Sequence, residues 1–494
     1  MNAKNLLFLF SDQHSAAVAG CYGDPIVQTP NFDRLAAQGV TFDNAYCSSP
    51  LCTPSRMSML TAKHPHNIQV WGNNDILRSG IPTMAHSLGV AGFDPCLVGR
   101  LHSIGPDQLL GYSERLVGDH HPNWVGLPRL DMGPLQGTAS PDRRSLRNSG
   151  AGQSSYELKD HDVTEAALKR LDRIAAEIAS GERERFAMTV GYMLPHAPFV
   201  AAEDKVAKYM DLVGLAHQRA PNENDEHLWI NRWRKYRDIL DVTHEEERRA
   251  RAAYYALVET LDAMVGRVLN KLEDLGLADN TLVVYASDHG EQIGERGLWW
   301  KHTFFEESVR VPLLMRLPGV LPAAERREQI VSLVDVTATM LDAMDAPKLP
   351  GADGQSFLSV AKNPGVPWHN TAYSEYCYGS QFDWGLDTAG QVRMVRKDGF
   401  KLVYFSDAPT QLFNLSHDPN ETLNLSDNAD YTDIKAELLL LIFNGWNPET
   451  VGQIIEETIP SKKLLSDWAK QTNPDSQHVW EMKPEFNRLD RPEA

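Results

Sequence analysis

Acidic and polar side chains follow two apolar runs of the sequence, at the point where each run ends. Asp12 and Gln13 come after "NLLFLFS", and Asp288 and His289 come after "TLVVYAS". If both runs are strands of one parallel sheet, these residues meet at the edge where ligands collect in such folds. Their three oxygen donors and one imidazole suit one divalent cation, Ca²⁺ or Mn²⁺. Singly, each aspartate would be interpreted as a helix N-cap and His289 as a loop histidine, but together the four predict a metal site.

A cysteine and an arginine four residues apart begin a short helical pattern within "SSPLCTPSRMSMLTAK" (48–63). Pro54 suits the first turn of a helix, where its missing N–H has no intrahelical acceptor to lose. Cys52 and Arg56 then share one face at a helix N-terminus, whose free N–H groups attract anions. A tetrahedral anion bound there would meet Cys52, Arg56 and the cation together. The competing interpretation is a buried cysteine without a chemical role.

The elements that must position these residues alternate between strand and helix. This alternation predicts an α/β fold, with a large, mostly parallel sheet sandwiched by helices. We expect strands at 5–10, 95–99, 186–193, 281–291 and 309–318, and helices at 29–40, 81–93, 162–180, 244–277 and 332–344.

The pattern changes after about residue 366, where short alternating segments replace the long apolar runs. The segments 392–406 and 411–418 predict antiparallel strands, with a hairpin turn at Asp398-Gly399, followed by a helix at 429–443. We therefore divide the chain into a domain carrying the site (1–365), a smaller C-terminal α+β subdomain (366–446) and a weakly patterned C-terminal arm (447–494).

Charge and composition exclude some classes of partner. The chain of 494 residues has 48 Lys+Arg against 66 Asp+Glu, a net charge of −18, which argues against binding to nucleic acid or an anionic membrane. No apolar run approaches the roughly 18 residues of a membrane span, and the segment "MNAKNLLFLFSDQH" is charged too early for a signal peptide. Five cysteines without a CxxC pair suit a reducing cytoplasm.

The segment Cys52-Thr53-Pro54-Ser55-Arg56 resembles the C-x-P-x-R signature of the type I sulfatases, in the alkaline phosphatase superfamily. The resemblance runs from residue 5 to about 425 and includes the following stretches: "SDQ", "TPNFDRLAAQGVTFDNAYCSSPLCTPSR", "GYMLPHAPF", "SDHGE" and "KHTFFEESVRVPLLMRLPG". It implies an alkaline phosphatase-like α/β sandwich with a smaller C-terminal antiparallel sheet. It also implies that a maturation enzyme oxidises Cys52 to formylglycine (3-oxoalanine), the nucleophile of the family.

The resemblance gives the first group of residues their roles. Those at the two strand ends match the family's metal ligands: Asp12, Gln13, Asp288 and His289. Asp-Gln replaces the commoner Asp-Asp, and His289 replaces a frequent asparagine; both departures occur in the branch with choline sulfatases and phosphonate monoester hydrolases. Arg56 matches the arginine that steadies the formylglycine.

A second group matches the residues that handle the substrate. His196 in "LPHAPF" and Lys301 in "WWKH" match the pair that contacts the sulfate and its leaving oxygen. In "GRLH" (99–102), Arg100 stands where the family usually has lysine, and His102 matches the histidine. Arginine keeps the charge but does not titrate, so it cannot shuttle a proton. Asn73 falls where the choline sulfatase branch has an active-site asparagine.

These residues together predict a hydrolase that acts on sulfuric ester bonds. One hydroxyl of the hydrated formylglycine attacks sulfur, Lys301 or His196 protonates the leaving oxygen, and His102 acts as the base that restores the aldehyde. The substrate is a small-molecule sulfate ester, arylsulfatase-like, with promiscuity toward phosphonate monoesters and phosphodiesters. Alternatives on the same scaffold are a phosphonate monoester hydrolase or phosphodiesterase and a choline sulfatase. A non-catalytic metal-binding protein with unmodified Cys52 is the alternative from another class.

The arm at 447–494 contains Trp468 and Trp480 in a polar segment without an evident core of its own. We expect it to cross to a twofold-related subunit and border its active site, as in oligomeric members of this branch, which predicts a homo-oligomer (dimer or tetramer). The alternative is a tail packed on its own subunit.

Overall fold

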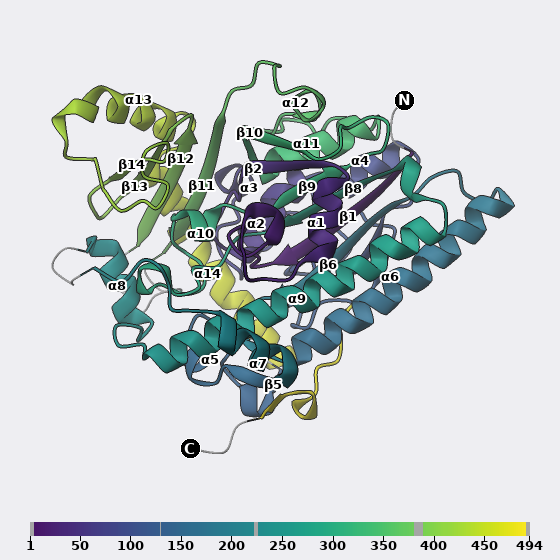
Figure 1. Cartoon of the computed structure of the whole chain (residues 1–494), viewed down its shortest axis with the longest axis horizontal. Helices are drawn as coiled ribbons and strands as arrows, with labels where there is room; N and C mark the ends of the chain where they lie inside the picture. Colours follow the sequence, from purple (N-terminus) through teal and green to yellow (C-terminus); the bar gives the residue numbers. More distant parts are fainter. Residues whose placement is uncertain (1–3, 129, 222–225, 380–388, 491–494) are drawn as a thin grey trace.

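The first apolar run of the chain forms β1 (Asn5–Asp12), in which every residue is buried. This computed structural model describes residues 4–128, 130–221, 226–379 and 389–490. Strand β1 lies within an eight-stranded sheet, in the order β10-β2-β9-β8-β1-β6-β3-β4 (Figure 1). Side chains buried on both faces of a central parallel strand explain why the run is continuously apolar.

The strands beside β1 follow the predicted alternation. The sheet is parallel except for β9, which runs antiparallel to both β2 and β8. Its other strands are β8 (Thr281–Ser287), β6 (Ala187–Pro195), β3 (Cys96–Gly99), β4 (Glu114–Leu116), β9 (Leu313–Arg316), β2 (Val40–Tyr46) and β10 (Glu325–Ser332). Strands β2, β4 and β10 were not predicted from the sequence pattern.

Helices cover both sides of the sheet (Figure 1). One group consists of α1 (Pro30–Ala37), α6 (Ser155–Ser180), α7 (Glu203–Leu212) and α9 (His244–Asp274), and a second of α2 (Cys52–Thr61), α4 (Met84–Val90) and α11 (Leu333–Ala343). Local signals set the starts of the long helices: Ser154 caps α6, and Thr243 with Glu246 forms a capping box on α9. Shorter helices are α3 (Pro65–Ile68), α5 (Arg144–Arg147), α8 (Leu228–Tyr236), α10 (Glu306–Val309) and α12 (Leu358–Lys362).

A separate antiparallel sheet follows, in the order β11-β12-β13-β14. It consists of β11 (Thr371–Tyr378), β12 (Gly390–Lys397), β13 (Phe400–Phe405) and β14 (Gln411–Asn414), and α13 (Thr432–Phe443) packs on it. The predicted turn joins β12 to β13, and Asp398 takes a left-handed φ of 46° there. The predicted fold class, a mostly parallel α/β sheet with a smaller antiparallel sheet, is confirmed.

The sequence did not predict the helix of the tail, where residues Pro448–Thr472 form the 25-residue helix α14. This helix lies on its own chain: Val451 and Ile455 are buried in an apolar cluster with the second sheet, and Lys462 forms an ion pair with Asp75 at 2.5 Å. The tail then completes a small three-stranded sheet, in which β15 (Arg488–Leu489) pairs with β5 (Gly150–Gln153) and β5 pairs with β7 (Val200–Ala201).

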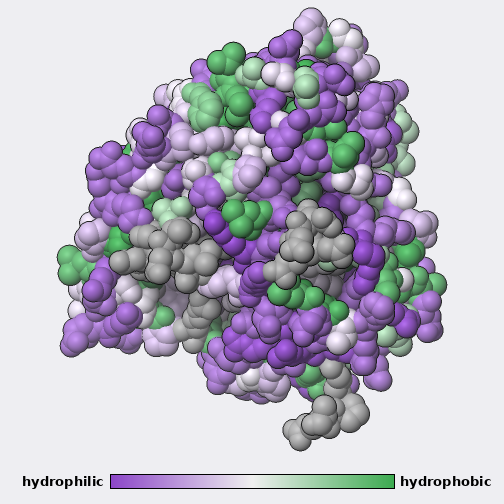
Figure 2. Space-filling model, turned by 90° about the vertical axis from the view of Figure 1, so that its left-hand side faces the viewer, coloured by the Kyte–Doolittle hydropathy of each residue, from purple (hydrophilic) through white to green (hydrophobic). Residues whose placement is uncertain are grey.

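The surface of the molecule agrees with its composition. The face in Figure 2 is mostly hydrophilic, with hydrophobic side chains in small scattered groups. Such scattered apolar groups are ordinary for a protein surface. In the described part of the chain, no helix combines the length and apolarity that crossing a membrane requires.

We predict that one buried side chain of the tail stabilises the start of α6. The Oδ1 atom of Asn487 accepts hydrogen bonds from the backbone N–H of Ser155 at 2.8 Å and from its hydroxyl at 2.7 Å. Asn487→Ala removes this acceptor from a buried donor, so the free energy of unfolding should fall by about 1–3 kcal/mol, measured by urea denaturation. The matched control, Asn444→Ala at an exposed position, should leave it unchanged. An unchanged Asn487→Ala protein would mean that this side chain adds no stability.

Candidate active site

The candidate site lies at the carboxyl ends of four neighbouring strands. Asp12 ends β1, Asp288 and His289 follow β8, His196 follows β6, and Arg100 follows β3. These strands are adjacent in the order β8-β1-β6-β3 and run parallel, so their carboxyl ends meet at one edge of the sheet. The topology therefore brings together side chains that are up to 277 positions apart in the sequence.

Cys52 is the first residue of α2 and is buried at the centre of this cluster. The ammonium group of Lys301 donates a hydrogen bond to its Sγ atom at 2.9 Å. The Nε2 atom of His289 lies 3.3 Å from Sγ, and Oδ1 of Asp12 lies 3.7 Å from it. A structural cysteine in an apolar core has no such neighbours, so these contacts favour the interpretation that position 52 takes part in chemistry.

Arg56 holds the two strand-end carboxylates together. Its Nε donates to Oδ2 of Asp288 at 2.8 Å, and its Nη2 donates to Oδ2 of Asp12 at 3.1 Å. Arg100 adds a second guanidinium, with Nε 2.5 Å from the same Asp12 oxygen. Burial raises the pKa of Asp12, but the charges of Arg100, Arg56 and Lys301 outweigh burial and hold the pKa well below its usual value. Asp12 is therefore ionised.

Four residues offer metal-binding atoms within 4.8 Å of one another: Asp12, Cys52, Asp288 and His289. Burial lowers the pKa of His289, which keeps its imidazole neutral and free to ligate. Gln13 fits the same group, because its amide nitrogen donates to Glu291 while its buried Oε1 has no hydrogen-bond partner among the described residues. An orphaned buried carbonyl oxygen beside two carboxylates is a natural ligand for a hard cation. The residues form a group that could hold a metal ion.

Lys301 and His196 form a pair beside Cys52. The ammonium group of Lys301 lies 3.0 Å from Nε2 of His196 and 3.2 Å from Nε2 of His289. Burial, with a smaller contribution from the charge of Lys301, lowers the pKa of His196. Its neutral imidazole can accept a hydrogen bond from the ammonium group, which orients both groups toward position 52.

His102 and Asn73 reach the cluster through other residues. Nδ1 of His102 lies 2.8 Å from Nη2 of Arg100, and the carbonyl of His102 accepts a hydrogen bond from the Thr53 hydroxyl at 3.3 Å. Oδ1 of Asn73 accepts from the backbone N–H of Thr53 at 3.0 Å. The structure thus places all eleven residues singled out from the sequence in one neighbourhood, and the roles given to them stay predictions.

Asp119, which was not predicted from the sequence, organises the loop that carries Arg100 and His102. The buried carboxylate of Asp119 accepts hydrogen bonds from the backbone N–H of His102 at 2.8 Å and from Arg115 at 2.5 Å, and lies 3.7 Å from Arg100. Burial raises the pKa of Asp119, but Arg115, His121 and Lys159 oppose burial and hold the pKa well below its usual value. Asp119 follows β4, so its place after a strand would have marked it as a candidate had β4 been predicted.

The fold and this cluster define a hydrolase for esters of tetrahedral anions, and comparison with known proteins gives the family. Residues 4–346 match the Sulfatase family, and residues 294–443 match the C-terminal region of N-sulphoglucosamine sulphohydrolase. The chain belongs to the Sulfatase family. Both the predicted family and the predicted enzyme class, a hydrolase of sulfuric esters, are confirmed.

Individual relatives place the chain within this family. Choline-sulfatase of Rhizobium meliloti (strain 1021) is 32% identical over 445 residues, covering 86% of this chain and 82% of the relative. The solved phosphonate monoester hydrolase of Agrobacterium radiobacter superposes with a TM-score of 0.74 at 24% identity, over 89% of this chain and 95% of that one. The phosphonate monoester hydrolase from Silicibacter pomeroyi superposes with a TM-score of 0.72 at 23% identity, over 90% and 95%. These two structures share the fold.

We predict that Asp119 matters for turnover although it contacts no residue of the metal group. Asp119→Asn removes the charge that holds Arg100 and the His102 backbone, so kcat/KM for a sulfate ester should fall roughly 10- to 100-fold, the size of effect that outer hydrogen-bond partners have in metal sites. Steady-state kinetics would measure this, with Asp131→Asn at an exposed turn as the matched control. Wild-type kcat/KM in Asp119→Asn would show that the loop needs no carboxylate there.

Proposed function

We propose that this sulfatase cleaves sulfate monoesters with a formylglycine at position 52 as the nucleophile. The observation that carries the proposal is the surroundings of Cys52: a buried helix N-terminus with Lys301 at 2.9 Å and a metal-binding group against its Sγ. Oxidation of Cys52 by a formylglycine-generating maturation enzyme would supply an aldehyde whose hydrate offers two hydroxyls.

The metal group supports a divalent cation, Ca²⁺ or Mn²⁺, held by Asp12, Gln13, Asp288 and His289. Such an ion supplies Lewis-acid polarisation of bound oxygen atoms. The carboxylates and the amide oxygen are hard donors, and both ions accept this set together with one imidazole.

The chain's own residues suit a tetrahedral monoanion. The cluster holds three cationic side chains, Arg56, Arg100 and Lys301, against the two carboxylates of Asp12 and Asp288. This excess of positive charge stabilises the negative charge that builds on the equatorial oxygens during transfer. Lys301 and His196, which share a hydrogen bond of 3.0 Å, are placed to bind the ester and to protonate its leaving oxygen.

His102 takes the role of the base that restores the resting site. Burial, together with the charge of Arg100, lowers its pKa well below the usual value, so its imidazole is neutral at pH 7 and able to accept a proton. Arg100 donates a hydrogen bond to Nδ1 at 2.8 Å and fixes the direction of the ring. Because a guanidinium can only donate, Nε2 carries the proton of the neutral ring, and Nδ1 takes up a proton only when the hydrogen bond from Arg100 opens. Asn73 holds the backbone of Thr53 and so steadies the residue next to the nucleophile.

Two substrate classes remain beside aryl sulfates. Similarity to a protein named choline-sulfatase at 32% identity favours choline sulfate as a second candidate. Phosphonate monoesters and phosphodiesters are a further class, because a singly charged tetrahedral centre with ester arms meets the same cluster of cations. The ratio of kcat/KM values for choline sulfate, 4-nitrophenyl sulfate and phenyl phosphonate separates the three.

Three further features of the enzyme are its oligomeric state, its location and its division into domains. We propose a homo-oligomer, dimer or tetramer, supported by the apolar side chains that α14 leaves exposed, among them Leu464 at 71% and Trp468 at 39%. Five unpaired cysteines support a cytoplasmic location. The division into a domain at 1–365, a subdomain at 366–446 and an arm at 447–494 is proposed as the unit organisation.

Mutation of Cys52 tests the proposed nucleophile. Cys52→Ala should remove nearly all turnover of 4-nitrophenyl sulfate without loss of fold, because no hydrated aldehyde can form. Peptide mass spectrometry of the wild type should find the thiol at position 52 replaced by an aldehyde. Cys21→Ala, at a partly exposed cysteine outside the cluster, should keep full activity. A Cys52→Ala protein that turns over at the wild-type rate would rule the nucleophile out.

The leaving group tests the role of Lys301. If its ammonium group donates the proton, Lys301→Ala should lower kcat/KM for alkyl sulfates by roughly 10²–10⁴-fold. Nitrophenyl sulfate has a good leaving group and should lose far less. Rates across a series of phenol sulfates measure the slope, and Lys348→Ala at an exposed site provides the control. Equal losses across the series would limit Lys301 to binding the ester.

A further inference from the structure

A pocket lies between α14 and the part of the chain that follows α3, beside the catalytic cluster. Its volume is about 260 Å³, and its lining combines residues of α14 with residues within 68–78 and with the loop at 124–125. Asn73 belongs to this lining, and its Oδ1 atom accepts a hydrogen bond from the backbone N–H of Thr53 at 3.0 Å. Because Thr53 follows Cys52 in α2, the pocket borders the residue next to the proposed nucleophile.

Trp124 connects the same pocket to the loop that carries His102. The backbone N–H of Gly105, three residues after His102, donates to the carbonyl of Asn123 at 2.7 Å. Trp124, the next residue, packs edge-on against Trp468 of α14, with the ring centroids 5.0 Å apart. Two loops that carry residues of the catalytic cluster therefore form part of the pocket wall. An ester whose sulfate lies in the cluster would have this pocket beside its organic part.

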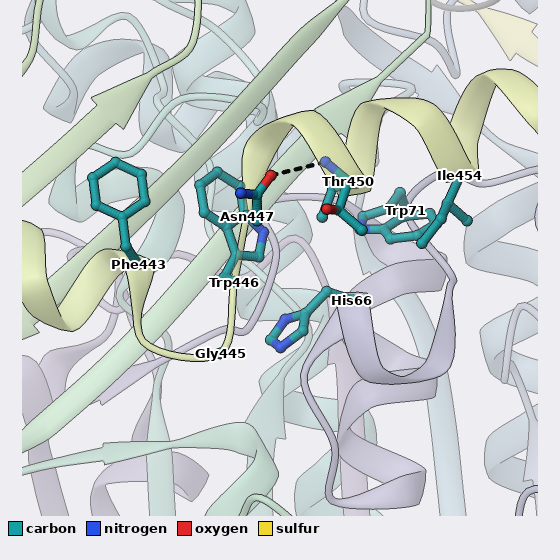
Figure 3. Close-up of a pocket in the computed structure, with 9 residues that line it drawn as sticks. His66, Trp71, Phe443, Gly445, Trp446, Asn447, Thr450 and Ile454 are labelled. Carbon is teal, nitrogen blue, oxygen red and sulfur yellow. Dashed lines mark hydrogen bonds between the residues drawn. The ribbon is translucent and has the colours of Figure 1, made fainter.

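Apolar and aromatic side chains supply much of the lining. They include Ile459 and Leu465 of α14 together with Trp71 and Trp124. Trp71 also borders a separate cavity at the α13–α14 junction, where Ile454 of α14 lies beside it (Figure 3). Two successive stretches of α14 thus face two different cavities. The small volume and the aromatic lining of the first pocket favour an apolar group of about the size of one ring.

The charged groups of the lining disfavour a cationic ligand. Among the lining residues that the structure describes, Asp75 is the only carboxylate. Its Oδ2 atom accepts from the backbone N–H groups of Trp71 at 2.8 Å and Gly72 at 3.0 Å, and its Oδ1 atom pairs with Lys462 at 2.5 Å. Arg78 adds a second positive charge to the lining. The described lining therefore has two cations against one carboxylate whose two oxygens are both engaged.

These charges decide between two ligands that aromatic walls accept. The face of a tryptophan attracts a quaternary ammonium group as well as an apolar ring. A quaternary ammonium group in this pocket would meet the net positive charge of Lys462 and Arg78 without a free carboxylate to offset it. An uncharged group of the same shape makes the same apolar contacts and meets no such repulsion.

We propose that this pocket receives the organic part of the sulfate ester and selects an uncharged apolar group over a trimethylammonium group. The inference rests on the proposed function and narrows its substrate class to sulfate esters of apolar alcohols and phenols. Lys462 determines the specificity, because it neutralises Asp75. The chain's own α14 provides the apolar wall through Ile459 and Leu465.

Two alkyl sulfates of the same shape test this preference. Choline sulfate carries a trimethylammonium group where 3,3-dimethylbutyl sulfate carries an uncharged tert-butyl group. The wild type should have a roughly tenfold higher kcat/KM for 3,3-dimethylbutyl sulfate, although the ammonium group makes choline the better leaving group. An equal or higher kcat/KM for choline sulfate would overturn the proposal.

A variant of Lys462 tests how the charge is read. Lys462→Met keeps the length of the side chain and leaves the carboxylate of Asp75 without its cation, so the ratio of the two kcat/KM values should shift roughly tenfold toward choline sulfate. Lys463→Met, at the exposed neighbouring position outside the lining, should leave the ratio unchanged. An unchanged ratio in Lys462→Met would remove Lys462 as the specificity-determining residue and overturn the proposal.

Binding of the free alcohols separates this inference from the proposed function, because it requires no turnover. Calorimetry on the full-length protein should show that 3,3-dimethyl-1-butanol binds more tightly than choline. Ile459→Asp places a charge in the apolar wall and should raise the Kd for 3,3-dimethyl-1-butanol roughly tenfold. Ile454→Asp, at the other cavity (Figure 3), should leave that Kd unchanged.

The two measurements fail in different ways. The expected Kd values in a protein that hydrolyses no sulfate ester would contradict the proposed function and support the ligand preference of the pocket. A Kd that is the same in Ile459→Asp and wild type, or tighter binding of choline, would overturn the pocket even in an active sulfatase.

Discussion

The active site depends on one buried carboxylate, that of Asp12 at the end of the central strand β1. A carboxylate removed from water is costly to ionise unless nearby cations compensate. Here Arg56 arrives from α2 at 3.1 Å and Arg100 from the end of β3 at 2.5 Å, both on the same oxygen. Removing one partner of such a buried pair leaves an uncompensated charge and costs about 3–5 kcal/mol. Asp12 therefore fixes the relative positions of the strand end, the helix that bears Cys52 and the loop after β3.

This arrangement makes an anion site in an acidic protein. The whole chain carries a net charge of −18, yet the cluster concentrates Arg56, Arg100 and Lys301 around two carboxylates at the edge of the sheet. All of these groups are nearly inaccessible to solvent, so their fields are less screened than those of surface charges. The net charge of the chain affects its solubility and its attraction to large charged partners. The electric field of the buried cluster decides which small ligand binds there.

The tail takes part in holding the active-site loop. The backbone N–H of Trp480 donates to the carbonyl of Asp119 at 2.6 Å, and Asn123 exchanges hydrogen bonds with Ser476 and Gln477. A Cβ atom at Gly118 would overlap the His478 carbonyl, so glycine permits this close approach. Asp119 therefore links the tail to Arg100 and His102. The last part of the chain, which the sequence suggested would reach a second subunit, packs against the loop of its own site.

The sequence alone determined the fold class, because local patterns of apolar and polar residues carry it, and it named the candidate site residues through strand ends and through the resemblance of their motifs to a known family. Continuous apolar runs marked β1, β6 and β8, and the polar residues after β1 and β8 identified Asp12 and Asp288, whereas His196 was identified by the resemblance of its motif to that of a known family. Strands and helices that are stable only through contacts with other parts of the chain were not predicted. Strands β2, β4 and β10 are short or half polar, and their neighbours in the sheet stabilise them. Helix α14 has few apolar residues, and its apolar face is recognised only because the second sheet buries Val451 and Ile455. Only the tertiary structure placed Lys301 against Cys52 and tied Asp119 to Arg100, since these contacts join residues through a sheet order that no local pattern contains.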